Sequence, residues 1–303
     1  SQNVGVGASA LDANTTASDN VAVGYLCMEN NTTGAHHAAL GAFALQSNTT
    51  GDENTAFGKS ALGYNETGNK NTAVGRSALS ANLASENTGV GYKTLLANTT
   101  GTRNTAVGAW SLDSNTTASD NTAVGYDALQ ANTTGTQNVA VGTYALDANT
   151  TTSYCTAIGY GALSACTADS NTAVGRLALE DCTTGSNNTA VGRFALGQLT
   201  TASQNVAIGD YALDAMTTAS DNTAVGYEAL TSNTSGSQNT GVGHRSLILN
   251  TTGLGLCAFG VGALDANTTG NYNAAFGRHA LSGNTTAHDN AAFGAFALQA
   301  NTT

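Results

Sequence analysis

The chain lacks proline, and charged residues are scarce. None of its 303 residues is proline and only 10% are charged, against about 25% in an average soluble protein. Twenty Asp and Glu outnumber nine Lys and Arg, which gives a formal net charge of −11, so the basic surface of a nucleic-acid-binding protein is missing. No apolar run reaches the roughly 20 residues of a membrane-spanning helix, and we expect no signal peptide before Ser1. We therefore expect no nucleic-acid partner and no membrane span.

Residues that usually carry chemistry are few and scattered. The five cysteines include no Cys-x-x-Cys pair, which argues against a structural zinc site. The five histidines form no His-Glu-x-x-His motif, and the calcium-binding repeat Gly-Gly-x-Gly-x-Asp is absent. We expect no enzyme activity, no cofactor and no metal site. The histidines are expected at the surface or in turns: His36, His37, His244, His279 and His288.

What the chain does contain is one short pattern, repeated along its whole length. From Asn3 onward N-T-A-V-G-x-x-A-L-x-x-N-T-T-G-x-x recurs every 17 residues; each copy is called a coil, and its residues are numbered as positions 1 to 17. Eighteen coils follow one another without interruption, and those that begin at Asn71 and Cys155 are one residue short. The coils begin at residues 3, 20, 37, 54, 71, 87, 104, 121, 138, 155, 171, 188, 205, 222, 239, 256, 273 and 290.

The variation between coils indicates which positions lie inside. Position 5 is always Gly, position 9 is Leu except for Met28, and position 4 is always Val, Ile, Leu or Phe. Alternation around positions 2–4 and 8–10 predicts two short strands per coil, with positions 4 and 9 in a common core. Positions 3 and 8 hold only small residues, so we expect a close approach there. A unit this short excludes a helical repeat or a propeller blade and predicts an all-β parallel β-solenoid of eighteen coils.

The sequence also repeats with a period longer than one coil. The hexapeptide TTASDN occurs at 15–20, 116–121 and 217–222, and it divides the chain into three 101-residue units of six coils, 1–101, 102–202 and 203–303. We expect a single solenoid over 1–303 without separate domains. The two ends match in register and neither carries a cap, as head-to-tail stacking of copies would require.

Positions 1 and 12 are mostly Asn, and the residues that replace it are mainly those of protein interiors, namely Cys, Leu and Met. We predict that both Asn positions lie inside turns, where amides of successive coils form hydrogen-bonded ladders. The alternative is that N-T-T, an N-x-Ser/Thr acceptor pattern, carries glycans along one edge of the solenoid; both hold if the turn is open. Asn30 and Asn187 also fit the pattern. At position 12 it occurs at Asn14, Asn31, Asn48, Asn65, Asn98, Asn115, Asn132, Asn149, Asn233, Asn250, Asn267, Asn284 and Asn301.

Two cysteines, Cys166 and Cys182, occupy position 12 of consecutive coils. Identical positions of stacked coils lie about 4.8 Å apart, within the Cα separation that a disulfide accepts. We predict that these two residues are interior neighbours, joined by a disulfide in an oxidising compartment and stacked as thiols otherwise. Cys27, Cys155 and Cys257 are expected to stay unpaired.

The coil at 121–137, NTAVGYDALQANTTGTQ, resembles the NTAxGxxALxxNTTGxx repeats of bacterial and phage fibre-like surface proteins of the tail-fibre type. It is more distantly similar to the head β-rolls of trimeric autotransporter adhesins. The resemblance extends over all eighteen coils and implies a fibre or adhesion role at an extracellular, cell or virion surface. The chaperone domain, coiled-coil stalk and membrane anchor of those proteins are not found in this sequence, which leaves a trimeric rod as an alternative to a single-chain one.

Three functions are compatible with these observations. The first is a structural subunit of an extracellular fibre that associates with itself end to end, and also laterally or as a trimer, with bound or attached glycans as further partners. The second is the shaft of an adhesin or a phage tail fibre. The third is an ice-binding solenoid, which is disfavoured because the paired threonines fall in a turn. Eleven of the eighteen aromatic residues fall at positions 6 and 7, which predicts an outer ridge for packing or for stacking on sugars.

Overall fold

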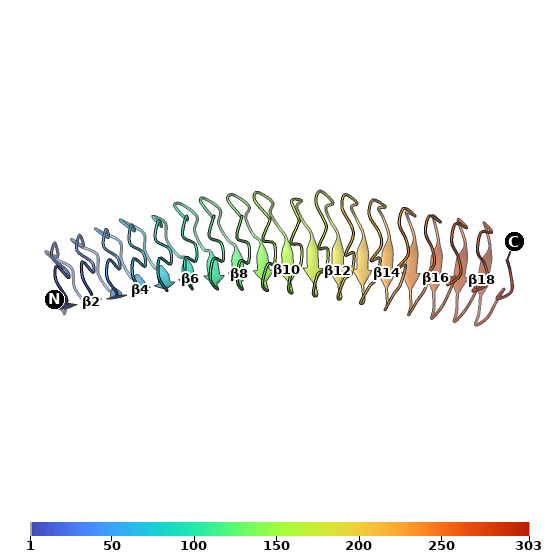
Figure 1. Cartoon of the computed structure of the whole chain (residues 1–303), viewed down its shortest axis with the longest axis horizontal. Helices are drawn as coiled ribbons and strands as arrows, with labels where there is room; N and C mark the ends of the chain where they lie inside the picture. The colour runs from blue at the N-terminus through green and yellow to red at the C-terminus, as the bar shows by residue number, and fades with distance from the viewer. Residues whose placement is uncertain (1, 303) are drawn as a thin grey trace. The chain divides into compact units, whose positions relative to one another are not determined.

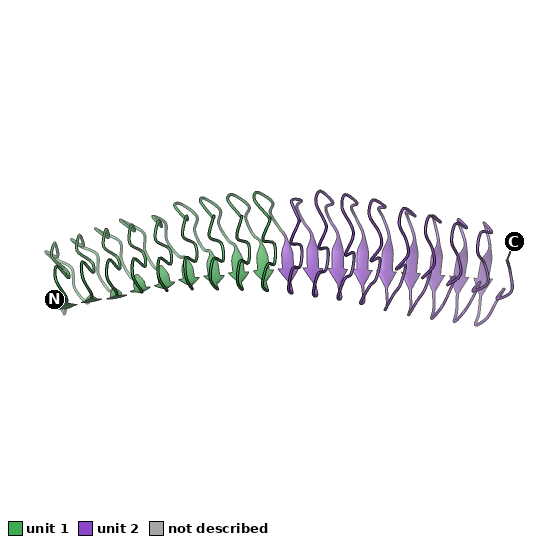
Figure 2. Cartoon of the chain, viewed as in Figure 1, with its two compact units in different colours: residues 1–154 green, residues 155–303 purple. Residues whose placement is uncertain are grey.

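The structure is a computed structural model that describes residues 2–302, and the only regular elements in that range are short strands. No helix that could cross a membrane is found in this range. The chain divides into two compact units, 1–154 and 155–303 (Figure 2). The strands of the first unit are β1 (Val4–Val6), β2 (Val21–Val23), β3 (Ala38–Leu40), β4 (Thr55–Phe57), β5 (Thr72–Val74), β6 (Thr88–Val90), β7 (Thr105–Val107), β8 (Thr122–Val124) and β9 (Val139–Val141). Those of the second unit are β10 (Thr156–Ile158), β11 (Thr172–Val174), β12 (Thr189–Val191), β13 (Val206–Ile208), β14 (Thr223–Val225), β15 (Thr240–Val242), β16 (Cys257–Phe259), β17 (Ala274–Phe276) and β18 (Ala291–Phe293).

Within each unit, successive strands pair in parallel and place equal positions of neighbouring coils side by side (Figure 1). Between β7 and β8, for example, Ala106 pairs with Ala123 and Val107 with Val124. The residues at positions 2 and 4 are mostly β-branched, which favours an extended strand. The predicted parallel β-solenoid with a coil of about 17 residues is confirmed.

The backbone of each coil is hydrogen-bonded to the coils on both sides. The position 2 N–H donates to the position 1 carbonyl of the following coil, as from Val4 to Asn20 (2.8 Å). The position 5 N–H donates to the position 4 carbonyl of the preceding coil, as from Gly24 to Val6 (2.8 Å). Residues outside the strand make the same kind of bond, since the N–H of position 9 donates to the position 8 carbonyl of the following coil. The absence of proline follows, because proline has no N–H to donate.

Each coil contains one strand, so the prediction of two strands per coil was wrong. Positions 7 and 9 have left-handed backbones, as at Tyr144 (φ 58°) and Leu146 (φ 52°). Two tight turns replace the expected second strand: the Ala145 N–H donates to the Gly142 carbonyl, and the Asn149 N–H donates to the Leu146 carbonyl. Leucine rarely adopts this conformation. The alternation of leucine with small residues around positions 8–10 therefore resembles a strand in the sequence, although the backbone there forms turns.

The core contains position 9 but not position 4, so the prediction that both positions share a common core was wrong for position 4. Position 9 is fully buried from Met28 to Leu281. The side chain that faces it comes from position 3: a Cβ built on Gly89 would lie 3.3 Å from Cγ of Leu79. Since successive strand residues point to opposite faces, position 4 points outward, and Phe293 is 72% exposed. The leucine leaves room opposite it for little more than a methyl group, which confirms the predicted close approach at positions 3 and 8.

The short coils lose their residue from the N-T-T turn. In the coil of β5, the Asn82 side-chain amide donates to the Ala84 carbonyl two residues later (2.7 Å). In the next coil, which has full length, the corresponding bond runs from Asn98 to Gly101, three residues later (2.9 Å). Strands β5 and β6 nevertheless pair in register. The turn therefore absorbs the deletion without disturbing the sheet.

The glycine at position 5 is required for two separable reasons. Its φ lies between 125° (Gly294) and 145° (Gly24) in every coil, a region that is essentially confined to glycine. In addition, a Cβ on Gly125 would lie 2.5 Å from the carbonyl oxygen of Gly142 in the next coil. Around Gly294 the nearest atom to such a Cβ is 4.0 Å away. The backbone conformation therefore requires glycine at both positions, whereas the close contact with the next coil requires it only at Gly125.

We predict that Gly125→Ala destabilises its coil more than Gly294→Ala does. The backbone conformation alone should cost about 1–3 kcal/mol in both variants, and Gly125→Ala adds a collision with neighbouring backbone. Local opening free energies from native-state hydrogen exchange in β8 and β18 measure the two losses. Equal losses in the two variants would contradict the steric role of the next coil.

Candidate functional site

Both Asn positions are buried and form the predicted ladders. At position 12, the Asn48 side-chain amide donates to Oδ1 of Asn31 in the preceding coil (2.7 Å) and to the Gly51 carbonyl of its own turn (3.1 Å). At position 1, the backbone N–H of Asn20 donates to Oδ1 of Asn3 (3.0 Å). Each amide thus joins its coil to a neighbour and closes its own turn. The Asn ladders are confirmed as structural elements.

The N-x-Ser/Thr sites differ in the exposure of their asparagine side chains. At position 12, Asn14 and Asn301 are half-buried, and the other eleven are 0% exposed. Asn30 and Asn187, the two sites outside this position, are exposed. In the folded chain the buried amides are closed to a glycosylating enzyme, whereas these two are open. The eleven buried asparagines are Asn31, Asn48, Asn65, Asn98, Asn115, Asn132, Asn149, Asn233, Asn250, Asn267 and Asn284.

His37 takes the place of an Asn in the position 1 ladder. The backbone N–H of Asn54 donates to Nδ1 of His37 (3.0 Å), and Nε2 lies 2.7 Å from the Gly51 carbonyl oxygen. These partners assign the proton to Nε2, so the neutral ring reproduces the acceptor and the donor of an asparagine. The ring is buried, and this burial lowers the pKa of His37 below 6.5. His37 is therefore buried inside the turn and not at the surface, while the other four histidines are exposed or half-exposed.

Three of the five cysteines meet in the interior of the second unit. Cys166 and Cys182 are neighbouring free thiols, and Thr167 and Thr183, which follow them, are joined by a backbone hydrogen bond (2.9 Å). Cys155 also contacts Cys166. Hydrogen bonding to Cys155 lowers the pKa of Cys166, but the Cys182 contact and burial outweigh it and raise the pKa to about 12. The stacked-thiol geometry is present, and the third thiol was not expected from the repeat pattern.

The outward face of the sheet carries a row of large apolar side chains, called here the outer ridge. In the first unit Val107 and Val124 are each 37% exposed. In the second unit the rings of Phe259, Phe276 and Phe293 stack in parallel, with centroids 5.2 and 4.9 Å apart. The outer ridge consists of Val6, Val23, Leu40, Phe57, Val74, Val90, Val107, Val124 and Val141 in the first unit, and Ile158, Val174, Val191, Ile208, Val225, Val242, Phe259, Phe276 and Phe293 in the second.

Aromatic residues at positions 6 and 7 form rows next to the outer ridge. In the first unit, Tyr92, Trp110, Tyr126 and Tyr144 pack edge to face, with centroids 5.2 to 5.8 Å apart. In the second unit the row contains cations, and the Arg193 guanidinium lies 4.8 Å from the centre of the Tyr211 ring. The rings therefore pack mainly against one another and against cations. Whether these rows also contact other chains or sugars stays a prediction.

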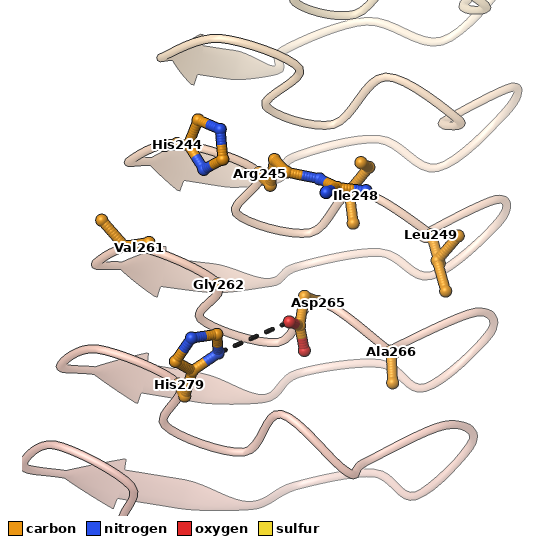
Figure 3. A pocket seen from close by; sticks show the side chains of 9 residues that line it. All are labelled: His244, Arg245, Ile248, Leu249, Val261, Gly262, Asp265, Ala266 and His279. Carbon is orange, nitrogen blue, oxygen red and sulfur yellow. Dashed lines mark ion pairs between the residues drawn. The ribbon is translucent and has the colours of Figure 1, made fainter.

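A hollow of about 470 Å³ interrupts the side-chain row in the second unit (Figure 3). It opens at Gly262, which occupies position 7 between Arg245 of the preceding coil and His279 of the following one. Nδ1 of His279 lies 3.6 Å from Oδ2 of Asp265, as the dashed line in Figure 3 shows. Partial burial raises the pKa of Asp265, while the nearby His279 opposes this effect. Within residues 2–302, no three metal-ligating side chains gather into a metal site.

Comparison of the chain with protein-family models, with curated proteins and with solved structures finds no match.

We predict that the stability of the first unit falls as the pH drops below about 6.5 and that His37→Asn removes this dependence. Because burial lowers the folded-state pKa of His37 below its ordinary 6.5, the unfolded chain binds the proton first. The stabilising contribution is complete above pH 6.5 and decreases below it. Thermal melting between pH 7.5 and 5 measures the effect. If the melting temperature of His37→Asn depends on pH as strongly as that of the wild type, the pH dependence does not come from the buried His37.

We also predict that secretion from a host that performs N-glycosylation leaves the eleven buried position 12 sites unmodified in the folded fraction. Their amides are held in the ladder, and a glycan there would break two hydrogen bonds per coil. The exposed Asn30 and Asn187 serve as internal controls for the accessibility of acceptors. Glycopeptide mass spectrometry measures which sites carry sugar. Sugar on most of the eleven would show that these asparagines are not held in the buried ladder of the secreted protein.

Proposed function

We propose that the chain is a structural element of an extracellular fibre, in which solenoids associate side by side through the outer ridge and end to end through their coil edges. The observation that carries the proposal is the outer ridge. It is apolar in all eighteen coils although it faces outward. The surface location rests on the resemblance of the repeat to fibre-like surface proteins.

The composition of the outer ridge differs from that of the exposed positions beside it. Position 6 accepts Lys59 and Arg76, and both are exposed. Position 4, two residues earlier in the same coil, never carries a charge or a polar group. A continuous exposed apolar surface is typical of an interaction site. This contrast supports a partner that covers position 4 and leaves position 6 at the border.

The area of the outer ridge fits a second copy of the chain. Nine coils at about 4.8 Å each, multiplied by the length of about 10 Å of a three-residue strand, give roughly 430 Å² of outward sheet face per unit. A standard interface takes about 800 Å² from each partner. The ridge of one unit thus supplies about half of that area, and the neighbouring aromatic rows add to it. Two ridges with the same spacing can also interdigitate along their length.

The edge of a coil supports end-to-end association. Leu298, at position 9 of the last coil, is 50% exposed, whereas position 9 is fully buried in every coil that has a neighbouring coil on both sides. A coil edge therefore presents the apolar surface and the unpaired strand groups that a further coil would cover. The further coil belongs either to a second copy or to a longer chain.

Paired substitutions on the two faces of β8 and β9 test the proposal. Val124→Lys with Val141→Lys places two charges on the outer ridge, and we expect the melting temperature to hold while side-by-side association weakens at least tenfold, or about 1.4 kcal/mol. Ala123→Lys with Ala140→Lys places the same charges in the core and should prevent folding. Sedimentation velocity, negative-stain microscopy and circular dichroism measure these effects. A wild type that stays monomeric at every concentration, or an outer-ridge variant that assembles as well as the wild type, would overturn the proposal.

A further inference from the structure

The hollow lies at Gly262, where one coil has no side chain at position 7. The backbone there is left-handed, with φ of 62° at Gly262, 57° at Arg245 and 53° at His279, so the glycine follows the path of its neighbours. A Cβ on Gly262 would lie 2.5 Å from Nδ1 and Cε1 of His279. The imidazole therefore leans over the place that a side chain would fill. The result is a recess of about 470 Å³, within the range of small-molecule sites.

The polar groups of the hollow balance one another in charge. Nε of Arg245 lies 3.3 Å from Oε2 of Glu228, and His279 lies beside Asp265. An anionic ligand would meet the carboxylate of Asp265 and an Arg245 that is already paired with Glu228, and a cationic ligand would meet the guanidinium of Arg245. The arrangement favours a neutral ligand that both donates and accepts hydrogen bonds, as hydroxyl groups do.

The remaining lining consists of the exposed His244 and of apolar side chains. Leu249 is 50% exposed and Val261 is 46% exposed, and both border the hollow together with Ile248. Figure 3 shows Asp265 and His279 turned toward each other, with Leu249 across the hollow from His279. A ligand that fits has one face of C–H groups and an edge of hydroxyl groups. A pyranose ring has this construction.

We propose that the hollow at Gly262 binds one sugar residue of a neutral saccharide, with its C–H face against Leu249 and Ile248 and its hydroxyl groups on Asp265, His279 and Arg245. The site belongs to a single chain and does not require assembly of a fibre.

The chain supplies a matched control in Gly161, the other glycine at position 7. Its φ is 61°, but a Cβ there would meet Cδ2 of Leu177 at 2.6 Å, so an apolar side chain covers it. Tyr144 and Tyr211 show that tyrosine fits the left-handed position 7 (φ 58° and 60°). Gly262→Tyr should therefore keep the backbone path, displace the His279 imidazole and fill the hollow, and Gly161→Tyr makes the same substitution elsewhere.

Titration of the full chain with methyl glucoside, methyl galactoside and methyl mannoside, followed by NMR shifts of the Gly262 and Asp265 amides, tests the proposal. We expect millimolar binding of at least one glycoside, a loss of at least tenfold in Gly262→Tyr, no change in Gly161→Tyr, and a weaker loss in Asp265→Asn, which keeps the size of the side chain. Sodium acetate and ethylammonium chloride serve as charged probes. Absence of glycoside binding, binding of a charged probe in its place, or equal effects of the two tyrosine variants would overturn the proposal. Asp265→Asn decides the matter if Gly262→Tyr does not fold.

Discussion

Hydrogen bonds between equal positions of neighbouring coils are the constraint on which the rest of the structure depends. Because each residue lies beside its own counterpart in the next coil, each interior position must hold a residue that packs well against a copy of itself. Leucine and alanine do so by shape, glycine by allowing backbone contact at Gly125 and Gly142, and asparagine by offering one donor and one acceptor along the same direction. The short list of residues at these positions follows from self-complementarity.

The exceptions show what the ladder requires. His37 keeps the pattern because its two ring nitrogens lie where the oxygen and nitrogen of an amide would be. Cys166 and Cys182 keep only part of it: each thiol still donates to a carbonyl of its own turn, at 3.3 and 3.2 Å. The bond within the turn is thus retained at these cysteines, and the amide contact between coils is replaced by a thiol contact.

The sequence predicted the parts of the fold that repeat and missed those that depend on backbone conformation. Eighteen versions of one coil were enough to place Asn48 and its equivalents inside and to predict parallel stacking. They could not show that Leu146 has a left-handed backbone, which removes the second strand. They also could not show that position 3 faces the leucine, which leaves position 4 outward. The hollow was missed for another reason: position 7 varies freely, so one glycine at 262 gives no signal until its neighbours are seen in space.

The N-T-T turn, which tolerates the loss of one residue at Asn82 without a shift in sheet register, has a consequence for how such chains can change. Length variation in this turn is uncoupled from the core, so inserted peptides would project from the corner of a coil. A guest peptide in several successive turns would be presented at a fixed interval of about 4.8 Å. The number of coils between two inserted peptides would then set the distance between them.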